Sequence, residues 1–276
     1  MHLGWKLAVV RRIDLRKSLF ILPNLFTLSS VLCGFYAILI ASAPDADQDA
    51  FYRSALLIIF AMFFDTIDGR VARLTKTQSA IGVQLDSLAD VVSFGVAPMV
   101  LVHRWSVGAL GTLGTLACFA YLAGGVIRLA RFNVLTTAAS GAPKKPSKWI
   151  LGLPIPGAAG ILISLVVAHT VARQTALRDH LGSPWLIFGV VLGLAFLMVS
   201  TIRFRSFKDI QLNARTLAFV ALAIGSTIFV AMRFHVAFAL VWLLASYVAI
   251  ALLETALRVT RRVRGRNEEP EPEPER

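Results

Sequence analysis

The chain has 276 residues, of which 57% are hydrophobic and 16% charged, and its mean hydropathy is +0.70. A soluble domain of this length normally has a smaller apolar share and more charge, so the composition excludes that class and predicts a membrane protein. The net charge of +12 comes from basic segments that are separated by apolar stretches. We therefore expect these segments to meet anionic lipid headgroups, and we expect no nucleic-acid partner.

The chain begins with a basic and amphipathic segment, residues 1–18, in which Trp5, Leu7, Val10 and Ile13 alternate with lysines and arginines. Such a pattern is typical of a helix that lies in the membrane interface, here on the cytoplasmic surface. A basic leader that only sets the topology is the alternative.

Apolar stretches of about the length of a membrane span follow, at about residues 19–42, 52–73, 81–103, 108–131, 150–170, 184–204, 213–233 and 236–257. Only helices and closed barrels satisfy their backbone groups in lipid, and long apolar runs favour helices. We therefore expect an all-α, polytopic membrane helix bundle with about eight transmembrane helices, forming one domain over residues 19–258. Residues 259–276 are basic, then acidic and proline-rich, which predicts a disordered tail.

The charge distribution predicts the orientation of the bundle. Most of the 28 lysines and arginines fall on the side of the N-terminus when the connecting segments are assigned to alternate sides. The arginines on the opposite side are Arg53, Arg104, Arg173, Arg178 and Arg233. The positive-inside rule then predicts that both termini are cytoplasmic. Cys33 and Cys118 each stand alone in an expected span, so we expect neither a disulfide nor a cysteine metal site.

The most informative stretch is "DTIDGRVARLTKTQSAIGVQLDSLAD", residues 65–90. Charged groups at membrane depth cost a few kcal/mol and so indicate function. Asp65 and Asp68 are three residues apart, and Asp86 and Asp90 four apart, so each pair shares one helix face. A short turn around residues 74–80 would bring the pairs together, where their repulsion favours a divalent cation. Oxygen ligands alone favour Mg²⁺, Mn²⁺ or Ca²⁺ over zinc.

Another interpretation applies to any single aspartate in this stretch. It could lie at the membrane surface, neutralised by Arg70, Arg73 or Lys76. Four aspartates in this spacing argue against that reading. Small residues accompany them, namely Gly69, Ala72 and Gly82, and they let a ligand approach the backbone. With the guanidinium of Arg73 as a fork for phosphate oxygens, these features indicate a nucleotide diphosphate.

The pattern Asp65-x2-Asp68-Gly69-x2-Ala72-Arg73-x8-Gly82-x3-Asp86-x3-Asp90 resembles the signature of the CDP-alcohol phosphotransferases. That resemblance implies a membrane enzyme, acting as a homodimer, that moves a phosphatidyl-type group from a CDP-linked lipid to an alcohol and releases CMP. It implies Mg²⁺ or Mn²⁺ held by Asp65, Asp68, Asp86 and Asp90, with Asp90 also as the catalytic base. The CDP-binding residues it implies are Asn24 and Thr27, in the similar stretch "LPNLFTLSSVLCG" (22–34), and Gly69, Ala72, Arg73 and Gly82.

The acceptor alcohol depends on weaker signals. "RLARFNV" (128–134) and "GLPIPGAAG" (152–160) resemble the phosphatidylserine synthase branch of that family, whose substrates are CDP-diacylglycerol and L-serine. Arg128 and Arg131 could bind the serine carboxylate, although they would equally suit the phosphate of glycerol 3-phosphate or the lipid, or serve only as basic anchors at the membrane.

We therefore expect a cell-membrane enzyme that makes phosphatidylserine at the cytoplasmic face. The alternatives are another acceptor (glycerol 3-phosphate, inositol or choline) or a membrane transporter. A transporter commonly shows a repeated pair of broken helices, and we find no such repeat in the sequence.

Overall fold

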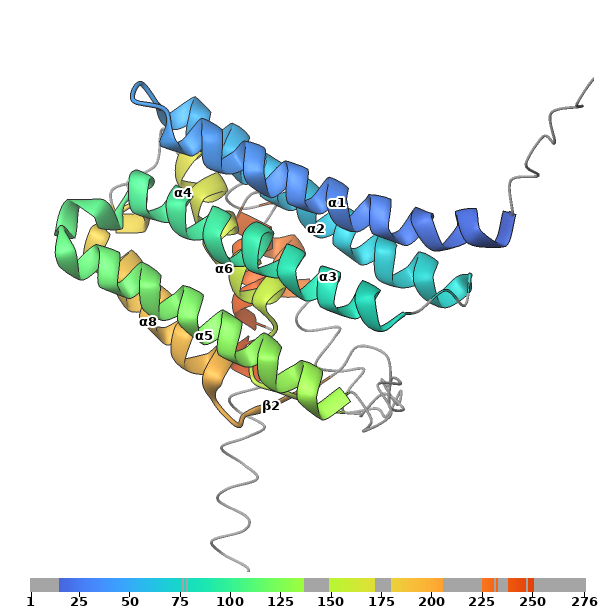
Figure 1. Ribbon diagram of the computed structural model, residues 1–276. Coiled ribbons are helices and arrows are strands. Elements are labelled where there is room, and N and C mark those ends of the chain that lie inside the picture. The colour runs from blue at the N-terminus through green and yellow to red at the C-terminus, as the bar shows by residue number, and fades with distance from the viewer. Residues whose placement is uncertain are drawn as a thin grey trace, which may run out of the picture.

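The computed structural model describes residues 15–75, 77, 79–136, 149–171, 180–205, 225–230, 232, 238–246 and 248–250. In this part of the chain the fold is a bundle of helices with one short two-stranded ribbon (Figure 1). Most of the expected interfacial segment 1–18, the tail 259–276 and most of the loop after residue 136 lie outside the described residues. The cytoplasmic position that we expect for both termini therefore stays a prediction.

The first layer is a helical hairpin of α1 (Leu15–Ser42) and α2 (Gln48–Leu74), which lie side by side in Figure 1. Asp47 caps α2, because its side chain accepts a hydrogen bond from the Ala50 amide at 2.8 Å and so satisfies one of the free donors of the first turn. Ser54 Oγ donates to the Ala37 carbonyl at 2.9 Å. This polar contact ties the two apolar helices together at a fixed depth.

The second layer is one continuous helix made of three pieces. It comprises α3 (Ala80–Asp90), the π-helical segment η1 (Val91–Val96) and α4 (Ala97–Trp105). Ser79 caps α3 by accepting a hydrogen bond from the Gly82 amide at 3.0 Å. The sequence predicted a helix over 81–103 but not its π-helical segment, which begins directly after Asp90.

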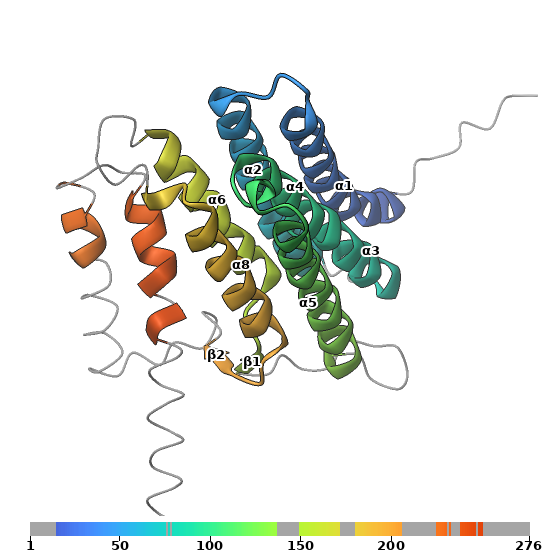
Figure 2. The ribbon, with the colours of Figure 1, turned by 90° about the vertical axis from the view of Figure 1, so that its left-hand side faces the viewer.

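The third layer contains α5 (Thr112–Thr136) and α8 (Pro184–Val199), which lie side by side in both views (Figures 1 and 2). The chain reaches α5 through the 3-10 turn η2 (Val107–Leu110) and Gly111, whose φ of 58° lies in the left-handed region. Helix α5 therefore begins at Thr112 and not at about residue 108, because this turn separates the two helices. Helix α6 (Ile155–Val171) packs against α2 and α4.

Two three-residue strands form an addition that the sequence did not predict. Strand β1 (Trp149–Leu151) pairs antiparallel with β2 (Arg203–Arg205). The spans expected at 150–170 and 184–204 are therefore shorter as helices. Gly152 has a φ of 75° and Pro154 has no amide hydrogen, so α6 cannot begin before this point.

Among the described residues, four helices are long and apolar enough to cross a membrane: Leu22–Ser42, Gln48–Leu74, Ala80–Trp105 and Thr112–Leu135. Helices α6 and α8 are apolar but shorter. Helical residues within 225–250 fall in the last two expected spans. The described residues thus confirm the expected all-α class and contain several helices that could span a membrane. Its core lies between the layers, around fully buried side chains such as Ile58, Phe94, Tyr121 and Met198.

Candidate active site

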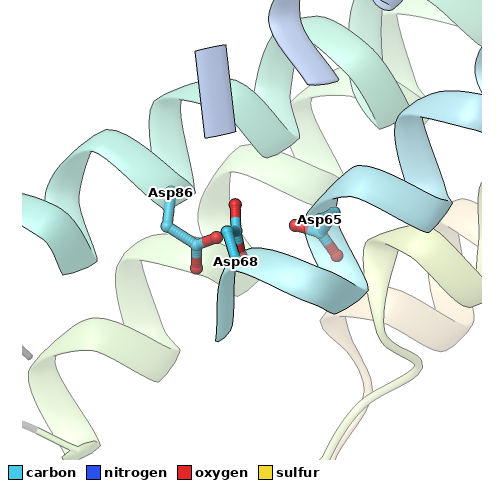
Figure 3. A group of neighbouring side chains, drawn as sticks. All are labelled: Asp65, Asp68 and Asp86. Atoms are coloured by element: carbon cyan, nitrogen blue, oxygen red, sulfur yellow. The ribbon is translucent and has the colours of Figure 1, made fainter. Parts of the chain in front are cut away.

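Three carboxylates converge between α2 and α3 (Figure 3). Asp65 and Asp68 lie one turn apart on α2, and Asp86 reaches them from α3. Each offers an oxygen within 4.8 Å of the others. The short connection between the two helices brings together residues about twenty positions apart in the chain, as the sequence predicted.

Asp90, the fourth predicted aspartate, is the last residue of α3 and is buried. Its carboxyl group lies near that of Asp65. Its Oδ1 atom is buried and has no hydrogen-bond partner among the described residues. Because such an oxygen costs about 1–3 kcal/mol when it is left unsatisfied, the three converging carboxylates together with this neighbouring oxygen fit a divalent cation. The donor set, made of oxygen atoms alone, is the one that Mg²⁺ and Mn²⁺ prefer.

Thr27 orients one of these carboxylates from the neighbouring helix. Its Oγ1 lies 2.7 Å from Asp68 Oδ2 and 3.1 Å from the Pro23 carbonyl. Thr27 and Asp68 are both buried, with 4% of each side chain exposed. A hydroxyl with two acceptors in reach and little freedom to move holds the Asp68 side chain in one direction, toward the cluster.

A cavity opens beside the aspartates, between α1, α2 and α3. Its lining residues are Pro23, Asn24, Thr27, Asp68, Gly69, Ala72, Thr77, Ser79, Gly82, Val83 and Asp86. It therefore contains all the residues for which the resemblance implied CDP binding except Arg73. A Cβ atom added at Gly69 would meet no atom of the described residues within 4 Å. The absence of a side chain there leaves room in the cavity rather than room for a neighbouring helix.

Arg73 lies outside this lining. Its Nε donates to the Gly69 carbonyl of its own helix at 2.8 Å, and the residue is exposed. Conversely, the cavity lining includes Thr77 and Ser79, in the turn between α2 and α3, which were not predicted from the sequence. The only available signal was the helix-capping serine before "AIGVQLD", which predicts a helix start and not a ligand.

Arg128 and Arg131, for which the sequence predicted the same role, have different surroundings. Arg128, on α5, is 6% exposed and lies over the ring of Phe132, with its guanidinium carbon 5.5 Å from the ring centroid. Its positive charge acts on Asp90. Near it, Asn133 Nδ2 donates to Ser87 Oγ of α3 at 2.8 Å. The C-terminal part of α5 is thus fixed against the helix that carries Asp86 and Asp90.

Arg131 binds backbone atoms instead. Its Nη1 donates to the Val199 carbonyl at 3.0 Å, and its Nη2 lies 3.1–3.4 Å from the carbonyls of Leu151, Met198 and Ser200. Carbonyls at a helix C-terminus lack partners within the helix. Arg131 satisfies those at the end of α8, so its guanidinium is engaged in holding α5, β1 and α8 together.

Comparison with known proteins agrees with this geometry. The model of the family described as CDP-alcohol phosphatidyltransferase matches residues 20–198. A Helicobacter pylori protein named CDP-diacylglycerol–serine O-phosphatidyltransferase is 36% identical over 197 residues, 71% of this chain and 77% of its own. Proteins with the same name from Bacillus subtilis and Saccharomyces cerevisiae are each 33% identical, over 191 and 147 residues. These alignments cover 68% and 52% of this chain, and 91% and 52% of the relatives.

Proposed function

Because the chain belongs to the CDP-alcohol phosphatidyltransferase family, we propose that it transfers the phosphatidyl group of CDP-diacylglycerol to L-serine, giving phosphatidylserine and CMP. The observation that carries this proposal is the name shared by relatives that align over most of their length, the Bacillus subtilis protein over 91% of it. The carboxylate cluster and the adjoining cavity support the chemistry independently of any name.

The cavity between α1, α2 and α3 receives the cytidine diphosphate head, while the acyl chains stay in lipid. Gly69, Ala72 and Gly82 leave the helix surfaces free of side-chain bulk, so the diphosphate approaches the backbone next to Asp68. Asn24 and Thr27 present polar groups from α1 to the nucleotide. Arg73 is exposed and bonds to the carbonyl of Gly69, which lines the cavity, so it would meet the diphosphate only at the edge of the cavity.

The residues that would hold Mg²⁺ or Mn²⁺ are Asp65, Asp68, Asp86 and Asp90. The cation would neutralise the charge of the diphosphate and the charge that develops on departing CMP. Asp90 also acts on the acceptor. Its carboxylate takes the proton of the serine hydroxyl as that oxygen attacks the β-phosphorus in line. The new oxygen–phosphorus bond forms as the bond to the CMP oxygen breaks, and CMP leaves with the bonding electrons.

Arg128 is the residue that we assign to the serine carboxylate. It is buried on α5, and its charge acts on Asp90, so a serine bound to its guanidinium would bring the hydroxyl toward the base. A guanidinium fork binds a carboxylate with two parallel bonds and fixes its direction. The substrate role predicted for Arg131 is weakened by its four backbone carbonyl acceptors.

We place the enzyme in the cell membrane with the aspartates near the cytoplasmic face, both termini in the cytoplasm and two chains in a homodimer. The excess of lysine and arginine on the side of the N-terminus supports the orientation. Serine is a cytosolic metabolite, which supports the same side for the active site. The family resemblance supports the dimer.

The test is a transfer assay on the purified protein in detergent or lipid nanodiscs. Labelled CDP-diacylglycerol is offered with serine, inositol, glycerol 3-phosphate or choline, and CMP and labelled lipid are measured. We expect serine alone to give rapid formation of a new lipid together with CMP. Faster transfer to another alcohol would keep the family chemistry and overturn serine as the acceptor. Transport of a substrate across the membrane without release of CMP would overturn both the chemistry and the acceptor.

A further inference from the structure

The helix that carries Asp86 and Asp90 changes its winding at one point, directly after Asp90. Residues Val91–Val96 form the π-helical segment η1, in which the Ala97 amide bonds to the Val92 carbonyl, five residues back. A π-helical turn takes more residues than an α-helical one, so it rotates the faces on either side of it relative to each other. The turn allows α3 to direct its aspartates toward α2 while the apolar residues of α4 face the core.

Pro98 gives a local reason for this change in winding. An α-helix would pair the Phe94 carbonyl with the amide of residue 98, but proline has no amide hydrogen. The Phe94 carbonyl would then lack its α-helical donor in a fully buried position. The hydroxyl of Tyr121, on α5, donates to this carbonyl at 3.2 Å.

Tyr121 is itself fully buried. Burying a hydroxyl without a hydrogen bond lowers the stability of the fold. Tyr121 precedes Arg128 by seven residues, two turns of α5, so the two side chains share one face. Helix α5 runs antiparallel to the helix formed by α3, η1 and α4 (Figure 1). Along this contact the Tyr121 hydroxyl meets the Phe94 carbonyl. The charge of Arg128 acts on Asp90, which precedes Phe94 by four residues.

The same segment is bonded from the opposite side by α1. Ser93 Oγ donates to the Ser30 carbonyl at 3.0 Å, and Ser30 lies one turn after Thr27. The backbones approach closely here, since a Cβ atom at Gly34 would lie 2.8 Å from Ser93 Cα. The segment η1 is therefore bonded to α5 on one side and, on the other, to α1, the helix whose Thr27 bonds to Asp68.

We propose that Tyr121 is a positioning residue for the reaction: its bond to the Phe94 carbonyl holds the π-helical segment, and this segment sets the position of Asp90, the last residue of α3. The inference rests on the proposed role of Asp90 as the base. Tyr121 lies two turns from Arg128 and is not expected to touch substrate. Its effect should therefore appear in the rate of the chemical step and not in substrate binding.

The substitution Tyr121→Phe tests this, because it keeps the buried ring and removes only the donor. We expect kcat to fall about tenfold, since a small misplacement of a catalytic group is enough for such a loss. KM for CDP-diacylglycerol and the affinity for CDP should change less than about twofold. The matched control is Thr170→Val, which removes a buried hydroxyl bonded to the Val166 carbonyl at 3.0 Å on α6. It should change the thermal unfolding midpoint at most, and leave kcat unchanged.

A double-mutant cycle with Asp90→Asn separates positioning from general stability. If Tyr121 acts through Asp90, Tyr121→Phe should not lower the residual rate of Asp90→Asn further, because the two effects are coupled. Equal losses in both backgrounds, or an unchanged kcat in Tyr121→Phe, would overturn the proposal. A normal rate for Asp90→Asn alone would instead overturn the proposed function of that residue. Should Tyr121→Phe not yield folded protein, Ser93→Ala, which releases the same segment from α1, carries the same cycle with the same expected sign.

Discussion

Thr27 on α1 holds Asp68 on α2 through a hydrogen bond of 2.7 Å between Oγ1 and Oδ2, across 41 positions of the chain. Asp68 is one of the three aspartates whose oxygens lie within 4.8 Å of one another. A hydroxyl that donates to a metal-binding carboxylate fixes the direction of the ligand oxygens. Helix α1 therefore shapes the acidic cluster as well as the cavity beside it.

Replacing Thr27 with valine keeps the shape of the side chain and removes the donor. We expect the affinity for Mg²⁺ or Mn²⁺ to fall about 10- to 100-fold, the usual size of such an indirect effect, with activity restored at high metal concentration. Metal titration of the transfer rate measures it. Thr66→Val is the control, because Thr66 is exposed and, among the described residues, bonds only to the Met62 carbonyl of its own helix. An unchanged metal requirement in Thr27→Val would remove Thr27 from the metal site.

The second prediction concerns the space beside Gly69. A Cβ atom there meets no protein atom within 4 Å, so Gly69→Ala should leave folding intact and gain up to about 1 kcal/mol of helix propensity. The methyl group would enter the cavity, and we expect KM for CDP-diacylglycerol to rise about tenfold or more. Gly189→Ala on α8, where an added Cβ also meets no atom of the described residues within 4 Å, should give the stability gain without the change in KM. Equal KM values in both variants would show that the nucleotide binds elsewhere.

The relations that could be predicted from the sequence are local. Spacing alone places each pair of aspartates on one helix face, Asp65 with Asp68 and Asp86 with Asp90. The turn between the two helices is short, so the helices must be neighbours. Apolar length predicts the long spans in the same way. The contact of Thr27 with Asp68 depends instead on how α1 packs against α2, and no spacing in the sequence encodes it.

The role of Arg131 and the π-helical segment were missed for a related reason. Hydropathy treats Arg128 and Arg131 as equivalent basic residues at the end of a span. The carbonyls that engage Arg131 belong to β1 and the end of α8, 20 to 69 positions away. Pro98 was visible in the sequence, but a proline inside an apolar stretch is also compatible with a simple kink. Only the packed helices show that Tyr121 supplies a donor there.

The third prediction separates the two arginines. Arg128→Lys should raise KM for serine about tenfold or more, because an ammonium cannot form two parallel bonds to a carboxylate, and should leave KM for CDP-diacylglycerol nearly unchanged. Arg131→Lys should lower stability, since a lysine cannot bond the same set of carbonyls, while both Michaelis constants stay near normal. Steady-state kinetics and thermal unfolding on both variants provide the comparison. A rise in the lipid constant alone in Arg128→Lys would assign Arg128 to the lipid phosphate.

The last prediction concerns Asp90, which combines a buried position, an Oδ1 atom without a hydrogen-bond partner in the described part of the chain, and the nearby charge of Arg128. Asp90→Asn preserves the size of the side chain but cannot accept the serine proton. We expect the single-turnover rate to fall by about two to four powers of ten, the usual contribution of a general base, while CDP still binds because Asp65, Asp68 and Asp86 remain. Asp65→Asn, or a chelator added to the unchanged enzyme, should instead abolish metal-dependent binding of CDP together with turnover. Binding isotherms and single-turnover rates on the same preparations distinguish the two patterns: loss of CDP binding in Asp90→Asn would make Asp90 a metal ligand first, and near-normal turnover would require another base.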